Sequence, residues 1–320
     1  MTDQVSPASP VSQGSSVHRR YGPSAQWLHI NEAHITQEAV ADLAGFKSNG
    51  VNFKLALWNP QPNGVRYLKA LTFALGMGLS PANRDRLRRT RHREVGDPYS
   101  VRCHGEPMCL DYLQAVHEVE FMAANVPLDG AQIMEIGAGY GRTCHTLLSN
   151  HEVAAYTIVD LPNTLALSRR YLRTVLEPEQ FEKIRFVGID EIDEQVRGAR
   201  FDLCVNVDSF AEMDPDTVRD YLALIDATCA HFYVNNPVGK YLDKTLDGHS
   251  QGTAVVELAL SSGLLREVID IHDSEAVLEQ VPAFLSAYRP GERWQCVAND
   301  RAVSWSYYWQ ALYRADPAGQ

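Results

Sequence analysis

The sequence predicts an α/β protein whose core is a mostly parallel sheet of seven strands, preceded by a helical N-terminal region. Beyond Asp129, short apolar runs alternate with segments of helical periodicity, which is typical of strand–helix–strand units. A glycine-rich turn follows the first of these runs, as in Rossmann-like folds. Between about Ile30 and Leu128, by contrast, apolar residues recur at helical spacing, for example from Tyr67 to Leu75.

This pattern divides the chain into three regions. Residues 1–22 are rich in Ser, Pro and Gln, which predicts a disordered tail. Residues 23–128 form the helical region, which we expect to act as a cap over a substrate or as a homodimer interface. Residues 129–320 carry the sheet and its ligand site.

Five parallel strands followed by a hairpin-like pair are expected in the third region. The strands are predicted at Gln132–Ile136, Tyr156–Asp160, Ile184–Val187, Phe201–Val207 and His231–Asn235, and then at about Leu265–His272 and Val303–Tyr313. The helices are predicted at about Gly141–Asn150, Asn163–Leu176, Pro215–Cys229 and Thr253–Ser262. The third helix has a strong start signal, because Asp214 can cap it and Pro215 suits the first helical position.

The composition is that of an ordinary globular protein, with 45% hydrophobic and 22% charged residues in 320. No apolar stretch approaches the length of a membrane helix and no secretory signal is present, so we expect a cytoplasmic protein without a membrane partner. The six cysteines are scattered, which favours reduced core residues over a metal or redox site.

Charge is unevenly distributed along the chain. Residues 1–93 hold 12 basic and 5 acidic residues, whereas residues 94–320 hold 17 basic and 35 acidic ones. Six arginines lie between Arg84 and Arg93, on a solvated face or in a patch for phosphate or a partner. Nucleic acid is not an expected partner, since the acidic remainder would repel a polyanion.

The glycine-rich turn favours S-adenosylmethionine as the cofactor. It has the spacing GxGxG rather than GxGxxG, and Glu135 stands two residues before its first glycine. A carboxylate there can meet the amino and sulfonium groups of S-adenosylmethionine but would repel the pyrophosphate of NAD. The cofactor residues expected in this segment are Glu135, Gly137, Ala138, Gly139, Gly141 and Arg142.

Further site residues are expected at the carboxyl ends of the following strands, where ligands bind in open parallel sheets. Asp160 can accept hydrogen bonds from both ribose hydroxyls, with Leu161 beside it, and Asp190 is placed for the adenine amine. Asn206 and Val207 complete the expected cofactor set. The expected acceptor-binding residues are Asp208, Glu212, Asn235, Asn236, Tyr241, His249 and Tyr112.

Four motifs stand out along the chain: MEIGAGYGR at Met134–Arg142, YTIVDLPNTL at Tyr156–Leu165, NVDSFAEM at Asn206–Met213 and YVNNPVGKY at Tyr233–Tyr241. Together they resemble a known family, the sugar O-methyltransferases of bacterial polysaccharide and antibiotic gene clusters. The resemblance spans roughly residues 50–310. It implies a class I methyltransferase core, S-adenosylmethionine as methyl donor and a sugar acceptor. The family is also similar to N-methyltransferases that act on aminoglycosides.

The acidic second half of the chain favours a cationic amino sugar as the acceptor. We expect Asp208 and Glu212 to anchor it, His249 to take up a proton, and no metal to take part. Trp58, Tyr67 and Trp305 are candidates for stacking on sugar rings, or else core residues. The alternatives are methylation of a sugar hydroxyl, an NAD-dependent oxidoreductase and a non-catalytic binding module.

Overall fold

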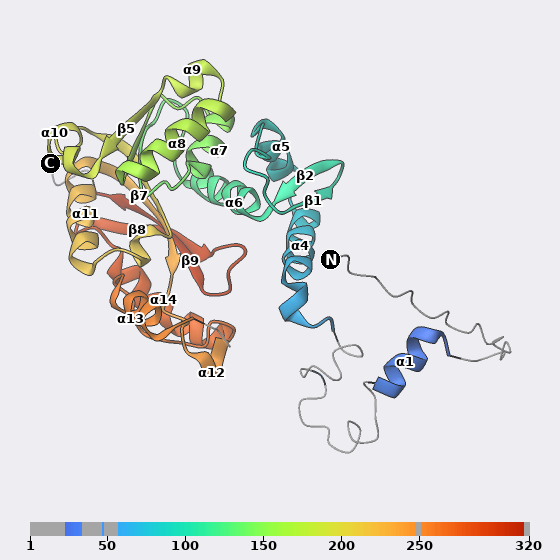
Figure 1. Ribbon diagram of the computed structural model, residues 1–320. Helices are drawn as coiled ribbons and strands as arrows, with labels where there is room; N and C mark the ends of the chain where they lie inside the picture. The colour runs from blue at the N-terminus through green and yellow to red at the C-terminus, as the bar shows by residue number, and fades with distance from the viewer. Residues whose placement is uncertain (1–22, 34–46, 48–56, 248–250, 317–320) are drawn as a thin grey trace, which may run out of the picture. The chain divides into compact units, whose positions relative to one another are not determined.

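The computed structural model describes residues 23–33, 47, 57–247 and 251–316 (Figure 1). The chain forms two compact units, Met1–Tyr67 and Leu68–Gln320. The predicted tail, residues 1–22, lies outside the described residues. The first unit contains helix α1 (Ala25–Ala33) and the start of α4 (Pro60–Gly78), which continues into the second unit. Within the first unit, the Tyr67 hydroxyl donates to the Trp58 carbonyl oxygen at 2.6 Å.

The second unit is built on a seven-stranded sheet in the order β5-β4-β3-β6-β7-β9-β8. The strands are β3 (Gln132–Ile136), β4 (Ala155–Asp160), β5 (Ile184–Gly188), β6 (Phe201–Val207), β7 (Cys229–Pro237), β8 (Trp294–Arg301) and β9 (Tyr308–Ala315). The strands β3 to β7 are parallel, while β9 runs antiparallel to both β7 and β8. The predicted Rossmann-like fold with a final hairpin pair is therefore confirmed.

Strand order reverses between β3 and β6, because the chain first builds outward to β5 and then returns to the other side of β3. Such a switch point leaves a crevice at the carboxyl ends of the two strands.

The helices between the strands are α7 (Arg142–Asn150), α8 (Pro162–Val175), α9 (Pro178–Phe181), α10 (Ile192–Gln195) and α11 (Pro215–Thr228), with short turns η1 (Ile189–Glu191) and η2 (Ser209–Ala211). After β7 come α12 (Lys244–Asp247), α13 (Thr253–Ser261) and α14 (Ser274–Ala287).

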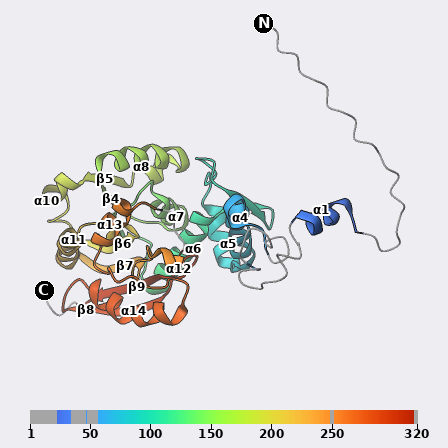
Figure 2. The ribbon, with the colours of Figure 1, turned by 60° about the horizontal axis from the view of Figure 1, so that its bottom comes forward.

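Two apolar layers cover the two faces of the sheet, because successive residues of a strand point to opposite sides. Met134 and Phe232 pack with α11 and α14 on one face, while Ile133 and Tyr233 pack with α6 (Leu110–Asn125), α7 and α8 on the other. Figure 2 shows α8 and α14 at opposite sides of the sheet. Because α6 shares this core, the segment from Leu68 to Leu128 belongs to the same compact unit as the sheet. Its role as a cap or a dimer interface stays a prediction.

The C-terminal part differs from the prediction. Residues 265–272 do not form a strand, since they contribute one bridge, between Val268 and Lys240. The apolar residues of this segment, such as Ile269, pack on the core without strand pairing. The true first strand of the hairpin is β8, which lies at the edge of the sheet. Most of its side chains are exposed or only partly buried, so its sequence lacks the apolar alternation that predicts a strand.

The region before the sheet is not wholly helical, contrary to the prediction. Between α5 (Pro81–Arg89) and α6 lies a hairpin of β1 (Ser100–Cys103) and β2 (Glu106–Cys109). Its two-residue loop is His104–Gly105, with φ of 52° and 83°. This is the backbone that a tight hairpin requires, and Gly105 adopts it without steric cost. Strands of four residues are too short to show a period of two.

Most arginines of the run from Arg84 to Arg93 have hydrogen-bond partners within the second unit. Arg93 is buried and donates to the carbonyl oxygen of Pro107 on β2, while Arg86 donates to Asn83 at 2.7 Å. Arg89 donates to Asn150 at the end of α7.

Five of the six cysteines are buried as expected, but Cys296 on the edge strand is exposed. None of the helices in the described ranges combines the length and apolar character that crossing a bilayer requires.

Asp226 on α11 binds side chains at the start of the edge strand β8, and we propose that it anchors this strand. Its Oδ1 accepts from Trp294 Nε1 and from Arg293 Nε, both at 2.7 Å, and Trp294 is fully buried. The change Asp226→Ala leaves a buried indole N–H without its acceptor, so we expect the free energy of unfolding to fall by about 2 kcal/mol. Urea denaturation measures this.

Asp216→Ala on the same helix is the matched control. Asp216 is paired with Arg219 at the surface, where both side chains are mostly exposed. Its loss is expected to change the unfolding free energy by less than about 1 kcal/mol. Equal effects of the two changes would contradict the proposed anchoring of β8.

Candidate active site

The glycine-rich turn adopts a backbone that glycine alone accommodates well. Gly137, Gly139 and Gly141 have φ of 73°, 58° and 96°. A Cβ on Gly137 would lie 2.1 Å from the Ser209 Oγ, so this turn and η2 approach each other closely. A Cβ on Gly139 would meet nothing within 4 Å. The turn therefore presents bare backbone to open space.

Asp160 ends β4 beside this turn. Its Oδ2 accepts from the Gly139 N–H at 3.1 Å, and its Oδ1 accepts from the Leu161 N–H at 2.7 Å. Partial burial raises the pKa of Asp160, while these backbone donors oppose the rise. The carboxylate is thus oriented by the backbone at the tip of its strand.

A cavity of about 620 Å³ lies at the carboxyl ends of β3, β4 and β6. Its size is that of small-molecule sites, which are mainly apolar with a few polar groups. Its polar lining residues include Asp160, Ser209, Glu212, Asp220 and Arg197, and its apolar ones include Leu161, Ile189, Ile192, Met213 and Leu224. Among the predicted cofactor residues, Gly137, Gly139, Asp160 and Leu161 line this cavity.

A second cavity of about 640 Å³ lies on the other side of η2. Glu212 lines both cavities, while Ser209 lines only the first and Asp208 only the second. The second cavity is also bounded by Lys240 and Tyr241 after β7, and its remaining lining residues include Asp214, Val255, Leu258, Ser262, Tyr307 and Tyr308. The turn from Asp208 to Glu212 therefore contributes residues to both cavities.

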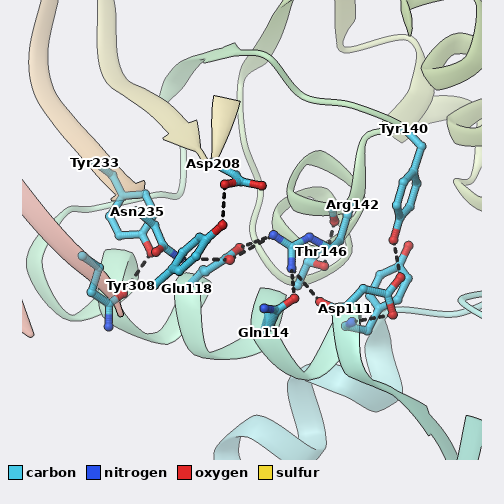
Figure 3. Close-up of polar contacts among 12 residues, drawn as sticks. Asp111, Gln114, Glu118, Tyr140, Arg142, Thr146, Asp208, Tyr233, Asn235 and Tyr308 are labelled. Atoms are coloured by element: carbon cyan, nitrogen blue, oxygen red, sulfur yellow. Dashed lines mark hydrogen bonds and ion pairs between the residues drawn. The ribbon is translucent and has the colours of Figure 1, made fainter. Parts of the chain in front are cut away.

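Asp208 has a strained backbone, with φ of 67° and ψ of −41°. Such conformations cost free energy in residues with a side chain and gather at functional sites. Its N–H donates to the Asn235 carbonyl oxygen at 2.8 Å, and its Oδ1 accepts from the Tyr308 hydroxyl at 2.5 Å (Figure 3). Burial, together with the nearby Asp208 carboxylate, raises the pKa of Tyr308, so this hydroxyl keeps its proton and acts as the donor.

Lys240 and Glu212 place opposite charges in the second cavity. The Lys240 ammonium group is buried and donates to the Ala211 carbonyl oxygen at 2.8 Å and to the Ser262 Oγ at 3.3 Å. Burial lowers the pKa of Lys240, although Glu212 and Asp208 oppose this. Burial and then the charge of Asp208 raise the pKa of Glu212.

Asn206 and Asn236 do not line either cavity, contrary to the roles expected of them. Both side chains are buried and join the strand ends to η2. Asn206 Nδ2 donates to the Ile136 carbonyl oxygen at 3.0 Å and to the Ser209 Oγ at 2.7 Å. Asn236 donates to Asn206 Oδ1 at 2.8 Å and accepts from the Ala211 N–H at 3.2 Å. These amides position the site rather than line it.

Glu135, an expected cofactor residue, is buried beneath the glycine turn and does not line the first cavity. It lies on the face of β3 that packs toward α7, because Ile136 occupies the other face. Its Oε2 accepts from the Tyr156 hydroxyl at 2.8 Å. Burial raises the pKa of Glu135 to about 7.

Arg142 also points away from the first cavity, toward α6 (Figure 3). One guanidinium nitrogen donates to both carboxylate oxygens of Glu118 at 2.9 and 3.2 Å, and the other donates to the Asp111 carbonyl oxygen at 2.8 Å. Glu118 accepts in addition from Asn235 Nδ2 at 3.3 Å. Asn235, an expected acceptor residue, therefore belongs to this buried group and lines neither cavity.

Of the remaining predicted residues, some line a cavity and others do not. Tyr112 is buried, with its hydroxyl 2.6 Å from both His145 Nδ1 and the Tyr171 hydroxyl, so it is a core residue rather than an acceptor contact. Asp190 is exposed and does not line the first cavity, whereas its neighbour Ile189 does.

Tyr241, an expected acceptor residue, lines the second cavity. Three further predicted cofactor residues, Ala138, Gly141 and Val207, also line neither cavity. Ala138 and Val207 pack on the sheet core, and Gly141 caps α7 against Leu172. His249 lies outside the described residues.

Several lining residues escaped the sequence prediction. Ser209 and Met213 lie inside the motif that carries Asp208 and Glu212, so their position could have been inferred from it. Tyr307 and Tyr308 carry no local signal, because their place at the site depends on the pairing of β9 with β7. Within the described ranges, no group of three or more His, Cys, Asp or Glu residues is arranged to hold a metal ion.

Glu135→Gln tests whether this carboxyl group is buried in the folded protein. The folded pKa of about 7 lies above the ordinary 4.5, so the proton bound by the folded state favours folding most below about pH 4.5. That contribution is lost as pH rises toward 7. Relative to the native protein, the variant should gain roughly 3 kcal/mol of unfolding free energy between pH 4.5 and 8. Urea denaturation at both pH values measures this.

Glu152→Gln is the control, since the Glu152 side chain is 91% exposed. Its stability should follow the native pH dependence. The same pH dependence in the Glu135 variant and the native protein would show that Glu135 is not buried as described.

No protein-family profile and no curated protein sequence matches this chain. Among solved structures, the methyltransferase domain of bacterial CtHen1-CN is 12% identical with a TM-score of 0.47, covering 64% of this chain and 100% of that one. The pyocyanin biosynthetic protein PhzM is 14% identical with a TM-score of 0.39, covering 61% of this chain and 53% of PhzM, so this chain spans about half of it. The glycopeptide N-methyltransferase MtfA, solved with S-adenosyl-L-methionine, is 14% identical with a TM-score of 0.42, covering 63% and 87%.

Proposed function

We propose that this protein is an S-adenosylmethionine-dependent methyltransferase that acts on an amino group of an amino sugar. The observation that carries the proposal is a pair of cavities at the carboxyl ends of the parallel strands, with Glu212 lining both. A transfer reaction needs donor and acceptor held next to each other, with the reacting atoms about 3 Å apart.

The residues of the first cavity suit S-adenosylmethionine. Asp160 can accept hydrogen bonds from ribose hydroxyls, and Leu161, Ile189 and Ile192 offer apolar contact for an adenine ring. The bare backbone at Gly139 leaves room for the ligand to lie against the turn.

Charge in the first cavity also favours S-adenosylmethionine over NAD. Its carboxylates are Asp160, Glu212 and Asp220, against one cation, Arg197. Arg197 is moreover paired with Asp193 at 2.7 Å. This balance suits a ligand with sulfonium and ammonium groups and disfavours a pyrophosphate. An oxidoreductase is therefore the weaker proposal.

When bound, S-adenosylmethionine supplies a methyl group on a sulfonium, which an electron pair of the acceptor attacks as the carbon–sulfur bond breaks. The protein must then hold the acceptor in line with that methyl group. The turn from Asp208 to Glu212 supports this proposal, because it contributes lining residues to both cavities. An amine acceptor needs only to be neutral at the moment of attack, whereas a hydroxyl needs a base.

The second cavity favours an amine over a hydroxyl acceptor. Among the described residues that line it, the carboxylates are Asp208, Glu212 and Asp214, and the one cation is Lys240. The Lys240 ammonium group, which donates to Ala211 and Ser262, offsets only one of these three negative charges. Carboxylates can bind the ammonium groups of an amino sugar through charge-assisted hydrogen bonds. In this proposal Asp208 and Glu212 anchor the acceptor and His249 receives the proton.

Asp160→Ala tests the cofactor site. Loss of hydrogen bonds from ribose to a charged group is expected to cost about 1.5 to 3 kcal/mol, which corresponds to a 10- to 150-fold weaker Kd for S-adenosylhomocysteine. Calorimetry measures it, with NAD as a comparison ligand that should not bind. Asp190→Ala is the matched control, since Asp190 is exposed beside the cavity without lining it. Tight binding of NAD, or an unchanged Kd in the Asp160 variant, would overturn the cofactor proposal.

The acceptor atom is tested with paired sugars that differ at one position, an amine in one and a hydroxyl in the other. Mass spectrometry of the products should find the new methyl group on nitrogen. Glu212→Gln should lower kcat/KM for the amine by about 10- to 100-fold, because it removes a charged partner of the ammonium group. Methyl found only on oxygen would replace the amine proposal by sugar O-methylation.

A further inference from the structure

Three tyrosine rings line the second cavity. Tyr241 follows β7, and Tyr307 and Tyr308 lie at the start of β9. The rings of Tyr241 and Tyr307 have centroids 5.6 Å apart at 65°, and those of Tyr307 and Tyr308 have centroids 5.0 Å apart at 76°. Adjacent rings are therefore steeply inclined, so the cluster presents ring faces and ring edges in different directions.

Carboxylates lie beside these rings. The hydroxyl of Tyr308 donates to Asp208 Oδ1, which joins one ring directly to one carboxylate (Figure 3). Glu212 borders the same cavity and is close enough to Asp208 for the charge of Asp208 to raise the pKa of Glu212. Two neighbouring negative charges beside aromatic rings favour a cation in the space between them.

Part of the cavity lining is apolar. Val255 and Leu258 of α13 belong to it, and they are 54% and 72% exposed. Large apolar side chains with this exposure would gain from contact with apolar groups of a ligand. A ligand that meets all three kinds of lining carries positive charge and an apolar surface together.

We propose that Tyr241, Tyr307 and Tyr308, with Asp208 and Glu212, form a binding site for an N-methylated ammonium group. This inference rests on the proposed amine acceptor and deepens it, because the preferred ligand is an amine that already carries methyl groups. Methyl groups spread the positive charge and reduce its hydration, so aromatic faces attract an alkylated ammonium more strongly than they attract a neutral group of equal shape.

Choline and 3,3-dimethylbutan-1-ol are the probes, since they have the same shape and differ in charge. Calorimetry in the presence of S-adenosylhomocysteine should give choline a Kd at least about tenfold lower than that of the neutral alcohol. Tyr241→Leu and Tyr307→Leu should each weaken choline binding by about fivefold, whereas Tyr241→Phe keeps the ring and should stay within about twofold. Tyr99→Leu is the matched control, because Tyr99 is 59% exposed and lines neither cavity.

Each outcome separates the two proposals. Equal affinity of the native protein for choline and the neutral alcohol, with S-adenosylhomocysteine bound normally, would overturn the ammonium site and leave the methyltransferase proposal intact. A preference for choline without any binding of S-adenosylhomocysteine would support the ammonium site and overturn the cofactor. If a leucine variant fails to fold, the comparison of the two probes on the native protein and on Tyr241→Phe still decides.

Discussion

Two buried amides hold the turn on which both cavities depend. Asn206 connects the last carbonyl group of β3 to Ser209, and Asn236 connects Asn206 to the backbone of Ala211. A buried polar group that loses its partner costs about 1 to 3 kcal/mol, so a connected set of this kind strongly favours one arrangement. Because Gly137 leaves no room for a Cβ beside Ser209, the glycine turn and η2 are fixed together. The strained backbone of Asp208 persists within this frame.

A second buried group ties the glycine turn to the region before the sheet. Arg142 at the start of α7 binds both oxygens of Glu118 on α6, and Glu118 also accepts from Asn235 on β7. A buried ion pair adds little net stability, because removing two charges from water costs nearly as much as their attraction returns. Its geometry nevertheless relates three elements that are distant in sequence. Through it, α6 becomes part of the support beneath the site.

The two cavities differ in the chemistry of their walls although they share Glu212. The first combines one oriented carboxylate, Asp160, with aliphatic side chains and bare glycine backbone. The second combines carboxylates with tyrosine rings and the partly exposed apolar face of α13. A nucleoside with a cationic end suits the first, and an alkylated amine suits the second. The excess of acidic residues in the second half of the chain thus has a local counterpart in both spaces.

The sequence alone determined the strand–helix alternation, the bounds of β3 and β6, the glycine turn and the position of Asp160, because each is encoded within a few neighbouring residues. It could not determine which polar side chains near the strand ends reach open space. Glu135, Asn206 and Asn236 are directed by the faces of the strands and by partners up to 70 residues away. The pairing of β9 with β7 brings Tyr308 to Asp208, which lies 100 residues earlier in the chain. The contact between Arg142 and Glu118 on α6 likewise joins segments that are distant in sequence. Only the tertiary structure decided these contacts, since they arise from the packing of distant segments and leave no local pattern.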